Sequence, residues 1–330
     1  MLQTKDLAVV ILNWNGKSLL EKFLPSVLKY SKDAGIYLAD NASSDDSIAF
    51  VSKHFPMVKI IQNTENGGYA KGYNDALKHV EEPLLCLLNS DVEVTENWLH
   101  PIISEFNANK NTAIIQPKIL DYNNKSHFEY AGAAGGFIDK FGYPYCRGRI
   151  FNTIEKDLGQ YNDIKTIFWA SGACLFIRNA VFKDLNGFDE SYFAHMEEID
   201  LCWRAFNKNY KTKYVGTSTI YHFGGATLSN TNPKKTYLNF RNSLFTLFKN
   251  TDSNVIFKIL ARMLLDGIAA VRFLLQLKPA FLFVILKAHG SFYFNLPRLL
   301  KQREDLAKLP GYYEMDSIVW SYFIKNKKTF

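Results

Sequence analysis

The chain has 330 residues, of which 47% are hydrophobic and 15% aromatic, so it can bury a full core and is not a disordered protein. Its four cysteines are spread singly without a CxxC pair, which indicates neither a disulfide framework nor a thiolate zinc site. The net charge is +7, and residues 251–330 hold twelve lysines and arginines against six aspartates and glutamates. This surplus of six predicts an anionic surface as a partner of the last quarter of the chain.

The sequence opens with MLQTKDLAVVILNWNG, whose short apolar run predicts a first β-strand rather than a signal peptide. Apolar runs of strand length then alternate with helical patterns over the first 120 residues. Strands are expected at 7–12, 37–39, 58–62, 84–88 and 113–116, and helices at about 17–31, 45–54, 69–79 and 95–109. This alternation predicts an α/β fold with a mostly parallel sheet flanked by helices on both faces.

Polar residues follow four of the predicted strands. They are Asn13 and Asn15 after the first strand, Asp40 and Asn41 after the second, Asn66, Gly67 and Gly68 after the third, and Asn89, Ser90 and Asp91 after the fourth. In sheets of this kind ligands bind at the carboxyl ends of the strands. The sequence therefore predicts that four strand ends face one crevice.

The later sequence changes character. Residues 125–162 are rich in Gly, Tyr and Asp, which predicts an irregular loop with short strands, and a loop of that size is usually functional. A strand is expected at 169–177, a short helix after Arg178, and a helix around 197–209.

The segment 255–286 is strongly apolar but is interrupted by charges, which lie on one face of a helix opposite an apolar face. A membrane-spanning helix needs about 20 mostly uncharged residues, so we expect a helix that lies on a membrane rather than one that crosses it. The alternative is an amphipathic helix packed on the rest of the protein.

Asp91 stands where a carboxylate could hold Mg²⁺ or Mn²⁺ together with substrate phosphates. The alternative is that Asn89 and Asp91 only cap the turn into a helix beginning near Thr95. At the third strand end, Gly67 and Gly68 permit backbone conformations closed to other residues, and the helix N-terminus behind them favours phosphate. Each signal is weak alone, and their common crevice is the stronger argument for a binding site.

Six motifs carry a resemblance to a known family. They are VVILNWNG, LADNASSDDS, NGGYAKGYNDA, LLNSDVEV, GFDESYFAHMEEIDLCWR and IYHFGGAT, in that order. Together they resemble the family 2 glycosyltransferases of the GT-A fold, in particular bacterial rhamnosyltransferase-like members that assemble surface polysaccharides. The resemblance covers about residues 7–245, and the set of motifs is specific although no single one is.

The resemblance implies which residues bind the donor. The nucleotide-sugar site would comprise Asn13, Asn15, Asp40, Asn41, Ser43, Asn66, Gly67, Gly68, Lys71, Asn74, Asn89, Ser90 and Asp91. The last aspartate of the family's DxD motif falls on Asp91, whereas Asn89 replaces the first, which leaves one carboxylate for a divalent cation, Mg²⁺ or Mn²⁺. His222 aligns with a metal-binding histidine of related members, and the alternative is an ordinary buried histidine in a strand.

The acidic cluster HMEEIDLCWR supplies the implied catalytic residues. On a helix, Glu197 and Asp200 share a face while Glu198 points about 100° away, so the three cannot all line one site. The alternative for each is a solvated acid favoured by the helix dipole. The resemblance places the general base at Glu198, which would deprotonate the acceptor hydroxyl in a single inverting displacement. Glu197 and Asp200 would hold the acceptor or anchor the loop, with Arg204 paired to Asp200.

The acceptor is expected near WASGAC, at Trp169, Gly172 and Ala173, with Trp169 either a stacking platform for a sugar or a core residue. The predicted domains are 1–245, a glycosyltransferase domain, and 246–330, a basic amphipathic helical region that associates with a membrane. Within the first, 1–120 would bind the nucleotide-sugar, and 121–245 would bind the acceptor and carry catalysis.

The sequence thus predicts a metal-dependent, inverting transfer from a nucleotide-diphosphate sugar to a saccharide or lipid-linked saccharide. A dTDP-sugar such as dTDP-rhamnose is the first guess, and UDP- and GDP-sugars remain open. We expect a cytoplasmic protein held peripherally at the inner face of the plasma membrane, and a homo-oligomer is left open.

Three other functions agree less well with the sequence. A dehydrogenase is disfavoured because LNWNGK stands where GxGxxG would follow the first strand. The main alternative is a catalytically degenerate nucleotide- or lipid-binding module, against which the joint presence of Asp91, Glu198 and His222 argues. No nucleic acid is expected as a partner, because the basic tail mixes its charges with long aliphatic side chains.

Overall fold

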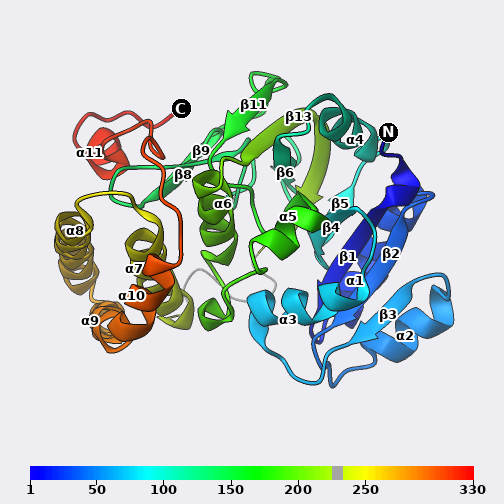
Figure 1. Ribbon diagram of the computed structural model, residues 1–330, viewed down its shortest axis with the longest axis horizontal. Helices are drawn as coiled ribbons and strands as arrows, with labels where there is room; N and C mark the ends of the chain where they lie inside the picture. The colour runs from blue at the N-terminus through cyan, green and yellow to red at the C-terminus, as the bar shows by residue number, and fades with distance from the viewer. Residues whose placement is uncertain (225–232) are drawn as a thin grey trace.

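The computed structural model of the chain describes residues 1–224 and 233–330 (Figure 1). The end of the IYHFGGAT motif, residues 225–227, lies outside the described residues.

A mixed β-sheet forms the centre of the fold. Its nine strands in the described residues are β1 (Leu7–Asn13), β2 (Gly35–Asp40), β3 (Lys59–Gln62), β4 (Leu84–Asn89), β5 (Val92–Val94), β6 (Thr112–Asp121), β11 (Ile164–Ile167), β12 (Cys174–Arg178) and β13 (Lys211–His222). The strand order is β11-β13-β6-β12-β4-β1-β2-β3, and β5 pairs with β13. The strands β3, β2, β1 and β4 are parallel, as predicted. Beyond them β12 runs antiparallel to both β4 and β6, so the sheet is parallel only in part.

Helices cover both faces of this sheet. They are α1 (Lys17–Tyr30), α2 (Ser47–His54), α3 (Gly68–Ala76), α4 (Leu99–Ala108), α5 (Asn179–Asp184) and α6 (Glu197–Asn207), with short 3-10 turns at Thr4–Asp6, Leu77–His79 and Glu190–Tyr192. Alternate residues of β1 point to opposite faces, as the pleat requires. Val9 therefore joins the core beneath α1, α2 and α4, whereas Val10 joins the core beneath α3, α5 and α6.

The loop-rich segment 125–162 contains a second, small antiparallel sheet, in agreement with the expected short strands. Its strands are β7 (Gly136–Ile138), β8 (Pro144–Cys146), β9 (Arg149–Ile150) and β10 (Thr153–Ile154), in the order β10-β9-β8-β7. The expected strand at 169–177 is shorter than predicted, since only Cys174–Arg178 pairs in the main sheet. The residues before Cys174 do not pair in the main sheet, because their backbone makes other hydrogen bonds. The backbones of Trp169 and Gly136 are hydrogen-bonded to each other, and the amide of Ser171 donates to the side chain of Gln116.

Helices dominate the last hundred residues, and they lie beside α6 at the end of the molecule away from β1–β3 (Figure 1). They are α7 (Pro233–Asn250), α8 (Val255–Leu275), α9 (Pro279–Phe294), α10 (Leu296–Glu304) and α11 (Ile318–Phe323). The domain boundary predicted at residue 245 falls inside α7. Phe248, Ile259 and Phe292 belong to the same buried cluster as residues of the main sheet, so this region shares a core with that sheet.

The prediction of a single helix at 255–286 is wrong. Two helices, α8 and α9, occupy this range and are separated at Leu277, whose φ of +58° ends α8 in the left-handed conformation. Pro279 then occupies the first turn of α9, where its missing N–H costs nothing. Within the described part of the chain, no helix has the length and apolar character needed to cross a membrane.

Candidate active site

The ends of β1 and β2 meet in a hydrogen-bonded network. The register of these strands pairs Asn13 with Asp40, and Asn13 Nδ2 donates to Asp40 Oδ1 at 2.9 Å and to Ser43 Oγ at 3.2 Å. The backbone amide of Asn15 donates to the same Ser43 Oγ at 2.8 Å. Asn13 and Asp40 are buried, whereas Asn15 is exposed. Four of the predicted donor-binding residues therefore lie together, with the buried pair positioning the more accessible pair.

The third strand end joins this network through Asn41. Its Nδ2 donates to the carbonyl of Gly68 at 2.9 Å and to Asn66 Oδ1 at 3.2 Å. Gly68 has a φ of +77°, and a Cβ there would lie 2.3 Å from the carbonyl oxygen of Phe193, so only glycine fits. Gly67 has an ordinary φ of −80°, so the expectation that both glycines use conformations closed to other residues is right for Gly68 and wrong for Gly67.

The N-terminal half of α3 is docked against the loop that precedes α6. The amide of Tyr69 donates to the Phe193 carbonyl at 2.7 Å, and Asn74 Nδ2 donates to the Phe188 carbonyl at 2.9 Å. The ammonium of Lys71 pairs with Asp75 in the same helix. Lys71 and Asn74 are thus engaged in contacts within the protein, and their assignment to the donor stays a prediction.

Asp91 lies in the turn between β4 and β5 and is 6% exposed. The following helix begins only at Leu99, and its N-cap Trp98 has no side-chain capping bond, so the capping alternative for Asn89 and Asp91 is not observed. The pairing of β5 with β13 instead brings His222 opposite Val92. As a result His222 Nε2 lies 3.2 Å from Asp91 Oδ1.

A third buried side chain, Glu129, completes this cluster and was missed in the sequence. Its Oε1 lies 3.5 Å from His222 Nδ1, a nitrogen without a hydrogen-bond partner among the described residues, and its Oε2 accepts from the amide of Ala131. The only signal in the sequence is an acid in an aromatic stretch, FEYAGAAGG, just before a glycine-rich turn.

Asp91 and His222 shift each other's pKa through their charges and hydrogen bond. Burial alone would lower the pKa of His222, but the carboxylates of Asp91 and Glu129 raise it to about 10. Burial would raise the pKa of Asp91, but the hydrogen bond and charge of His222 bring it below the ordinary value. Without a cation the histidine is therefore protonated, and a cation that binds here displaces a proton.

The donor set of this cluster suits a divalent cation. A carboxylate oxygen and an imidazole nitrogen are ligands of Mn²⁺ and related ions, and Asp91 and His222 bring one of each to within 3.2 Å. In the described segments 1–224 and 233–330, no group of three or more His, Cys, Asp and Glu is placed to hold a metal ion. Asp91 and His222 therefore fit a cation whose remaining ligands are phosphate and water.

The two glutamates at the start of α6 differ in their surroundings. Glu197 is 4% exposed, and its Oε2 finds no hydrogen-bond partner within residues 1–224 and 233–330, whereas Glu198 is half-buried. Burial, followed by the charge of Glu198, raises the pKa of Glu197 well above its ordinary value. Burial also raises the pKa of Glu198, against hydrogen bonds from the backbone, to about 7. Glu198 is thus the acid that can gain and lose a proton near neutrality.

Asp200 is fully buried in an ion-paired network. It accepts from Arg204 Nε at 2.8 Å, as predicted, and from Asn250 Nδ2 at 2.8 Å, while Lys249 Nζ lies at 2.9 Å. Arg204 in turn donates to the carbonyl of Gly187 at 2.8 Å. Of the two roles predicted for Asp200, the structure therefore favours anchoring of the loop, because a carboxylate with no exposure cannot contact an acceptor.

The backbone before α6 is strained. Phe193, His195 and Met196 have φ values of 63°, 70° and 73°, although none is glycine. Such conformations cost of order 1–3 kcal/mol each and persist where the surroundings enforce them, often at functional sites. Here they set the direction in which α6 starts, and so the direction of Glu197 and Glu198.

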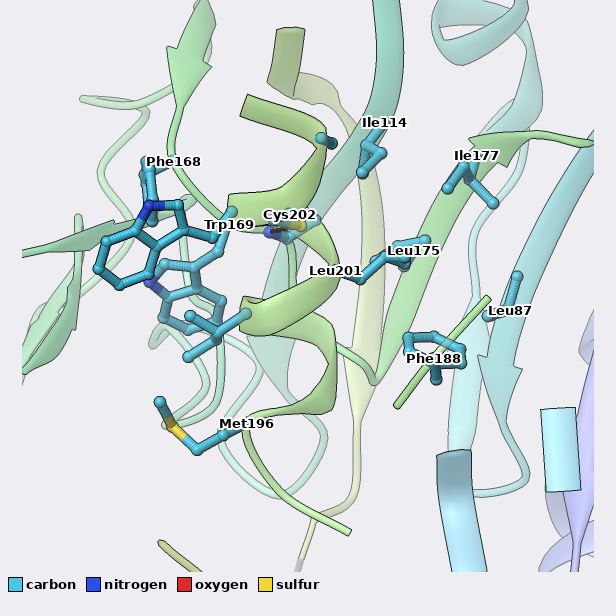
Figure 2. Packing of buried hydrophobic residues seen from close by; sticks show 14 of the residues in the cluster. Leu87, Ile114, Phe168, Trp169, Leu175, Ile177, Phe188, Met196, Leu201 and Cys202 are labelled. Atoms are coloured by element: carbon cyan, nitrogen blue, oxygen red, sulfur yellow. Dashed lines mark hydrogen bonds between the residues drawn. The ribbon is translucent and has the colours of Figure 1, made fainter. Parts of the chain in front are cut away.

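The predicted acceptor residues divide into two groups. Trp169 is 4% exposed, and its Nε1 donates to the Phe137 carbonyl at 2.8 Å. Figure 2 shows it among core side chains beside α6, close to Phe168. The prediction of a stacking platform is therefore corrected, because no face of the indole is free to meet a sugar and the core alternative applies.

Gly172 and Ala173 instead link β4 to α3 through hydrogen bonds. The amide of Asn89 donates to the Ala173 carbonyl at 3.0 Å, and the Tyr69 hydroxyl donates to the Gly172 carbonyl at 2.9 Å. Tyr69 lies close enough to the glutamates for their charges to raise its pKa, although burial is the larger cause. Tyr69 was not singled out in the sequence, where it reads as one more aromatic in a helix.

Comparison with known proteins identifies the family. The pattern described as Glycosyl transferase family 2 matches residues 8–185, more than half of the chain. The chain belongs to this family. One relative, N-acetylglucosaminyl-diphospho-decaprenol L-rhamnosyltransferase of Mycobacterium tuberculosis, is 23% identical over 66% of this chain and 76% of its own length. Two others are also 23% identical: the low-salt glycan biosynthesis hexosyltransferase Agl10 of Haloferax volcanii over 83% and 86%, and rhamnosyltransferase WbbL of Escherichia coli over 65% and 82%.

Solved structures confirm the GT-A fold. GalNAc-T7 with UDP, GalNAc and Mn²⁺ matches with a TM-score of 0.59 at 16% identity, over 74% of this chain and 48% of that one, about half its length. Staphylococcus aureus TarS in complex with UDP-GlcNAc matches with a TM-score of 0.56 at 18% identity, over 90% and 83%. The prediction of a family 2 glycosyltransferase is confirmed, and the chain is an enzyme that transfers a sugar from a nucleotide-sugar donor.

Proposed function

We propose that the chain transfers a sugar with inversion, using a divalent cation held by Asp91, His222 and the diphosphate of the donor. The observation behind this proposal is the meeting of Asp91 and His222, 3.2 Å apart, at a sheet edge linked through Asn89, Ala173, Gly172 and Tyr69 to the loop that precedes α6. A single displacement needs charge stabilisation for the leaving group and a base for the attacking hydroxyl, and these residues can supply both.

The residues divide the chemistry as follows. A bound cation would neutralise the charge of the departing diphosphate. Glu198 takes the proton of the acceptor hydroxyl as it attacks the anomeric carbon, and a base with a pKa of about 7 is well matched to neutral pH. Glu197 keeps its proton, which avoids a second negative charge beside the base. Asn13 and Asp40 orient Asn15 and Ser43 toward the nucleotide. No covalent intermediate is formed.

The relatives suggest the substrates. Two are named rhamnosyltransferases, and one of them acts on a decaprenol-linked sugar, which supports dTDP-rhamnose as donor and a lipid-linked saccharide as acceptor. The place of action would be the inner face of the plasma membrane, in the synthesis of a surface polysaccharide. The alternative of a catalytically degenerate binding module is disfavoured, because Asp91 and His222 lie 3.2 Å apart and burial raises the pKa of Glu198 to about 7, as a base at neutral pH would need.

A transfer assay tests this proposal. The purified chain is incubated with Mn²⁺, a panel of dTDP-, UDP- and GDP-sugars, and a lipid-linked N-acetylglucosaminyl diphosphate. We expect release of a nucleoside diphosphate with one donor class, and NMR of the product should show the anomeric configuration opposite to that of the donor. Product with the donor's configuration, or no release with any donor, would contradict the proposal.

The pH dependence of transfer should report Glu198. Because the base acts ionised and burial raises its pKa to about 7, kcat/KM should rise with pH through 7 and be about tenfold below its plateau at pH 6. The profile is measured at saturating Mn²⁺ so that loss of the cation does not add to the acid limb. A glutamate with the ordinary pKa of 4.5 would leave the rate flat from pH 6 to 8, and that result would remove the assignment.

Glu129 should tune the affinity for the cation. Glu129→Gln keeps the shape of the side chain but removes the charge facing His222 Nδ1, and loss of such an outer partner typically costs about 10–100-fold in metal affinity. The measurement is a calorimetric titration of Mn²⁺ into protein saturated with the preferred nucleoside diphosphate. The matched control is Glu105→Gln, another buried glutamate with a cationic partner, Lys213 at 3.1 Å, which should leave the affinity unchanged. Equal affinities for both variants would show that Glu129 has no such role.

A further inference from the structure

Helix α8 is packed with its charged face inward. Lys258, Arg262 and Asp266 are 4%, 3% and 0% exposed, whereas Leu264 and Ile268 on the opposite face are 71% and 63% exposed. A surface helix of a globular protein normally buries its apolar stripe and exposes its charges. The two faces predicted from the sequence are therefore present in part. Lys258, Arg262 and Asp266 of the polar face contact the protein while Arg272 is exposed, and most of the apolar face is left uncovered.

Each of the three inward charges has a hydrogen-bond partner, which fixes this orientation. Arg262 Nε donates to Asp266 Oδ1 at 2.8 Å, and its Nη1 donates to the carbonyl of Gly142 at 3.1 Å. The hydroxyl of Tyr143 donates to the same Asp266 oxygen at 2.7 Å, and the Tyr143 ring lies 3.7 Å from the guanidinium carbon. Lys258 Nζ donates to Thr251 Oγ1 at 2.8 Å. Turning the helix over would bury apolar groups but would strand these charges or break their hydrogen bonds.

The uncovered surface continues onto α9, which packs beside α8 (Figure 1). We call it the apolar platform, defined by its most prominent side chains: Leu260, Leu264, Ile268, Leu275, Leu277 and Phe283, each 58–89% exposed. Contiguous exposed apolar surface of this kind marks an interaction site on a soluble domain. It lies on a rigid base, because both helices are packed against α7 and α8 is tied to the loop at 141–143.

The charges around the platform indicate which kind of partner it can bind. Between residues 255 and 294 the only acid is Asp266, which is buried, whereas Arg272, Lys278 and Lys287 are exposed. A second copy of the chain would bring these cations against their own equivalents, which is unfavourable. An anionic bilayer surface instead attracts each exposed cation near it, and it accepts apolar side chains into the boundary between headgroups and acyl chains.

We propose that the apolar platform inserts into the surface of a bilayer that contains anionic phospholipid, with α8 and α9 lying in the plane of the interface. The inference deepens the proposed function, because a lipid-linked acceptor would be embedded in the same bilayer. The platform is also connected to the catalytic loop. Arg241 of α7 donates to the carbonyl of Ser191 at 2.9 Å, and Asn242 donates to that of His195 at 2.7 Å, directly before Glu197. A membrane held by the platform would therefore lie in a defined position relative to the base.

Co-sedimentation with liposomes tests the proposal on the full chain. Vesicles of phosphatidylcholine with 30% phosphatidylglycerol are compared with vesicles of phosphatidylcholine alone. The wild type should bind the anionic vesicles, and the double variant Leu264→Glu/Ile268→Glu should bind them at least tenfold more weakly. The matched control is Leu158→Glu/Ile164→Glu, which alters two apolar residues that are 78% and 51% exposed outside the platform and should bind like the wild type.

Further readouts keep this test separate from the proposed function. Because Leu264 and Ile268 are exposed, the double variant should fold, and it should turn over a detergent-solubilised acceptor at the wild-type rate. Replacing Arg272, Lys278 and Lys287 with glutamine should abolish the preference for anionic vesicles. Unchanged binding by the double variant, or no binding of either vesicle by the wild type, would overturn the inference. A lipid-free wild type that is dimeric, with a monomeric double variant, would show that a second copy covers the platform and would also overturn it.

Discussion

Glu198→Gln is expected to lower kcat by about 10²–10⁴-fold while leaving the affinity for the donor nucleotide unchanged, because it removes only the group that accepts the proton. Glutamine has the size of glutamate, so the helix start and its strained preceding turn should remain in place. The measurement is single-turnover transfer at pH 8, together with the dissociation constant of the nucleoside diphosphate from calorimetry.

The neighbouring acid provides the control for this prediction. Burial keeps the proton on Glu197, and a neutral carboxyl resembles an amide, so Glu197→Gln should cost less than about tenfold in kcat. If the two variants exchange their effects, Glu197 is the base and the assignment of Glu198 is wrong. If neither lowers kcat by more than tenfold, the base is not on α6.

Asp91→Asn should lower transfer by about a thousandfold, since stabilising a leaving diphosphate through a cation contributes several kcal/mol. The substitution keeps a ligand oxygen and the shape of the turn but removes the one carboxylate that pairs with His222 at 3.2 Å. The loss should be partly recovered at high Mn²⁺, because the weakened site can still be filled by mass action. The measurement is the rate of transfer as a function of Mn²⁺ concentration.

A nearby carboxylate serves as the control for Asp91. Glu93 lies two residues further along, in β5, and pairs with Lys125 rather than with the histidine. Glu93→Gln should keep the wild-type rate and the wild-type dependence on Mn²⁺. A comparable loss in both variants would mean that the effect arises from general damage to β5 or from net charge, and not from coordination.

Local patterns were sufficient to predict the part of the fold that holds the donor site. The strands β1 to β4 are short apolar runs that end in polar residues, and parallel pairing places those ends at one edge of the sheet. Asn13, Asp40 and Ser43 therefore meet where the sequence predicts.

Contacts between distant segments decided the rest. Glu129 reaches His222 only because β13 and the loop after β6 fold together, which no local pattern reveals. The sequence around Trp169 would look the same whether the indole stacks on a sugar or fills a core. Its burial depends on a contact with Phe137 of the small sheet, which is distant in sequence. For α8 the sequence separates two faces but does not say which one meets the protein. The break between α8 and α9 was not predicted, although Pro279 indicates it in the sequence.

The proposed chemistry requires that a nucleoside diphosphate and a cation bind together at Asp91 and His222, and calorimetry measures this directly. UDP, dTDP and GDP are each titrated into the wild-type chain, once with saturating Mn²⁺ and once with EDTA. We predict that at least one of them binds in Mn²⁺ and that its affinity falls at least tenfold in EDTA. Equal affinity in the two buffers, or no binding of any nucleotide in Mn²⁺, would contradict the account.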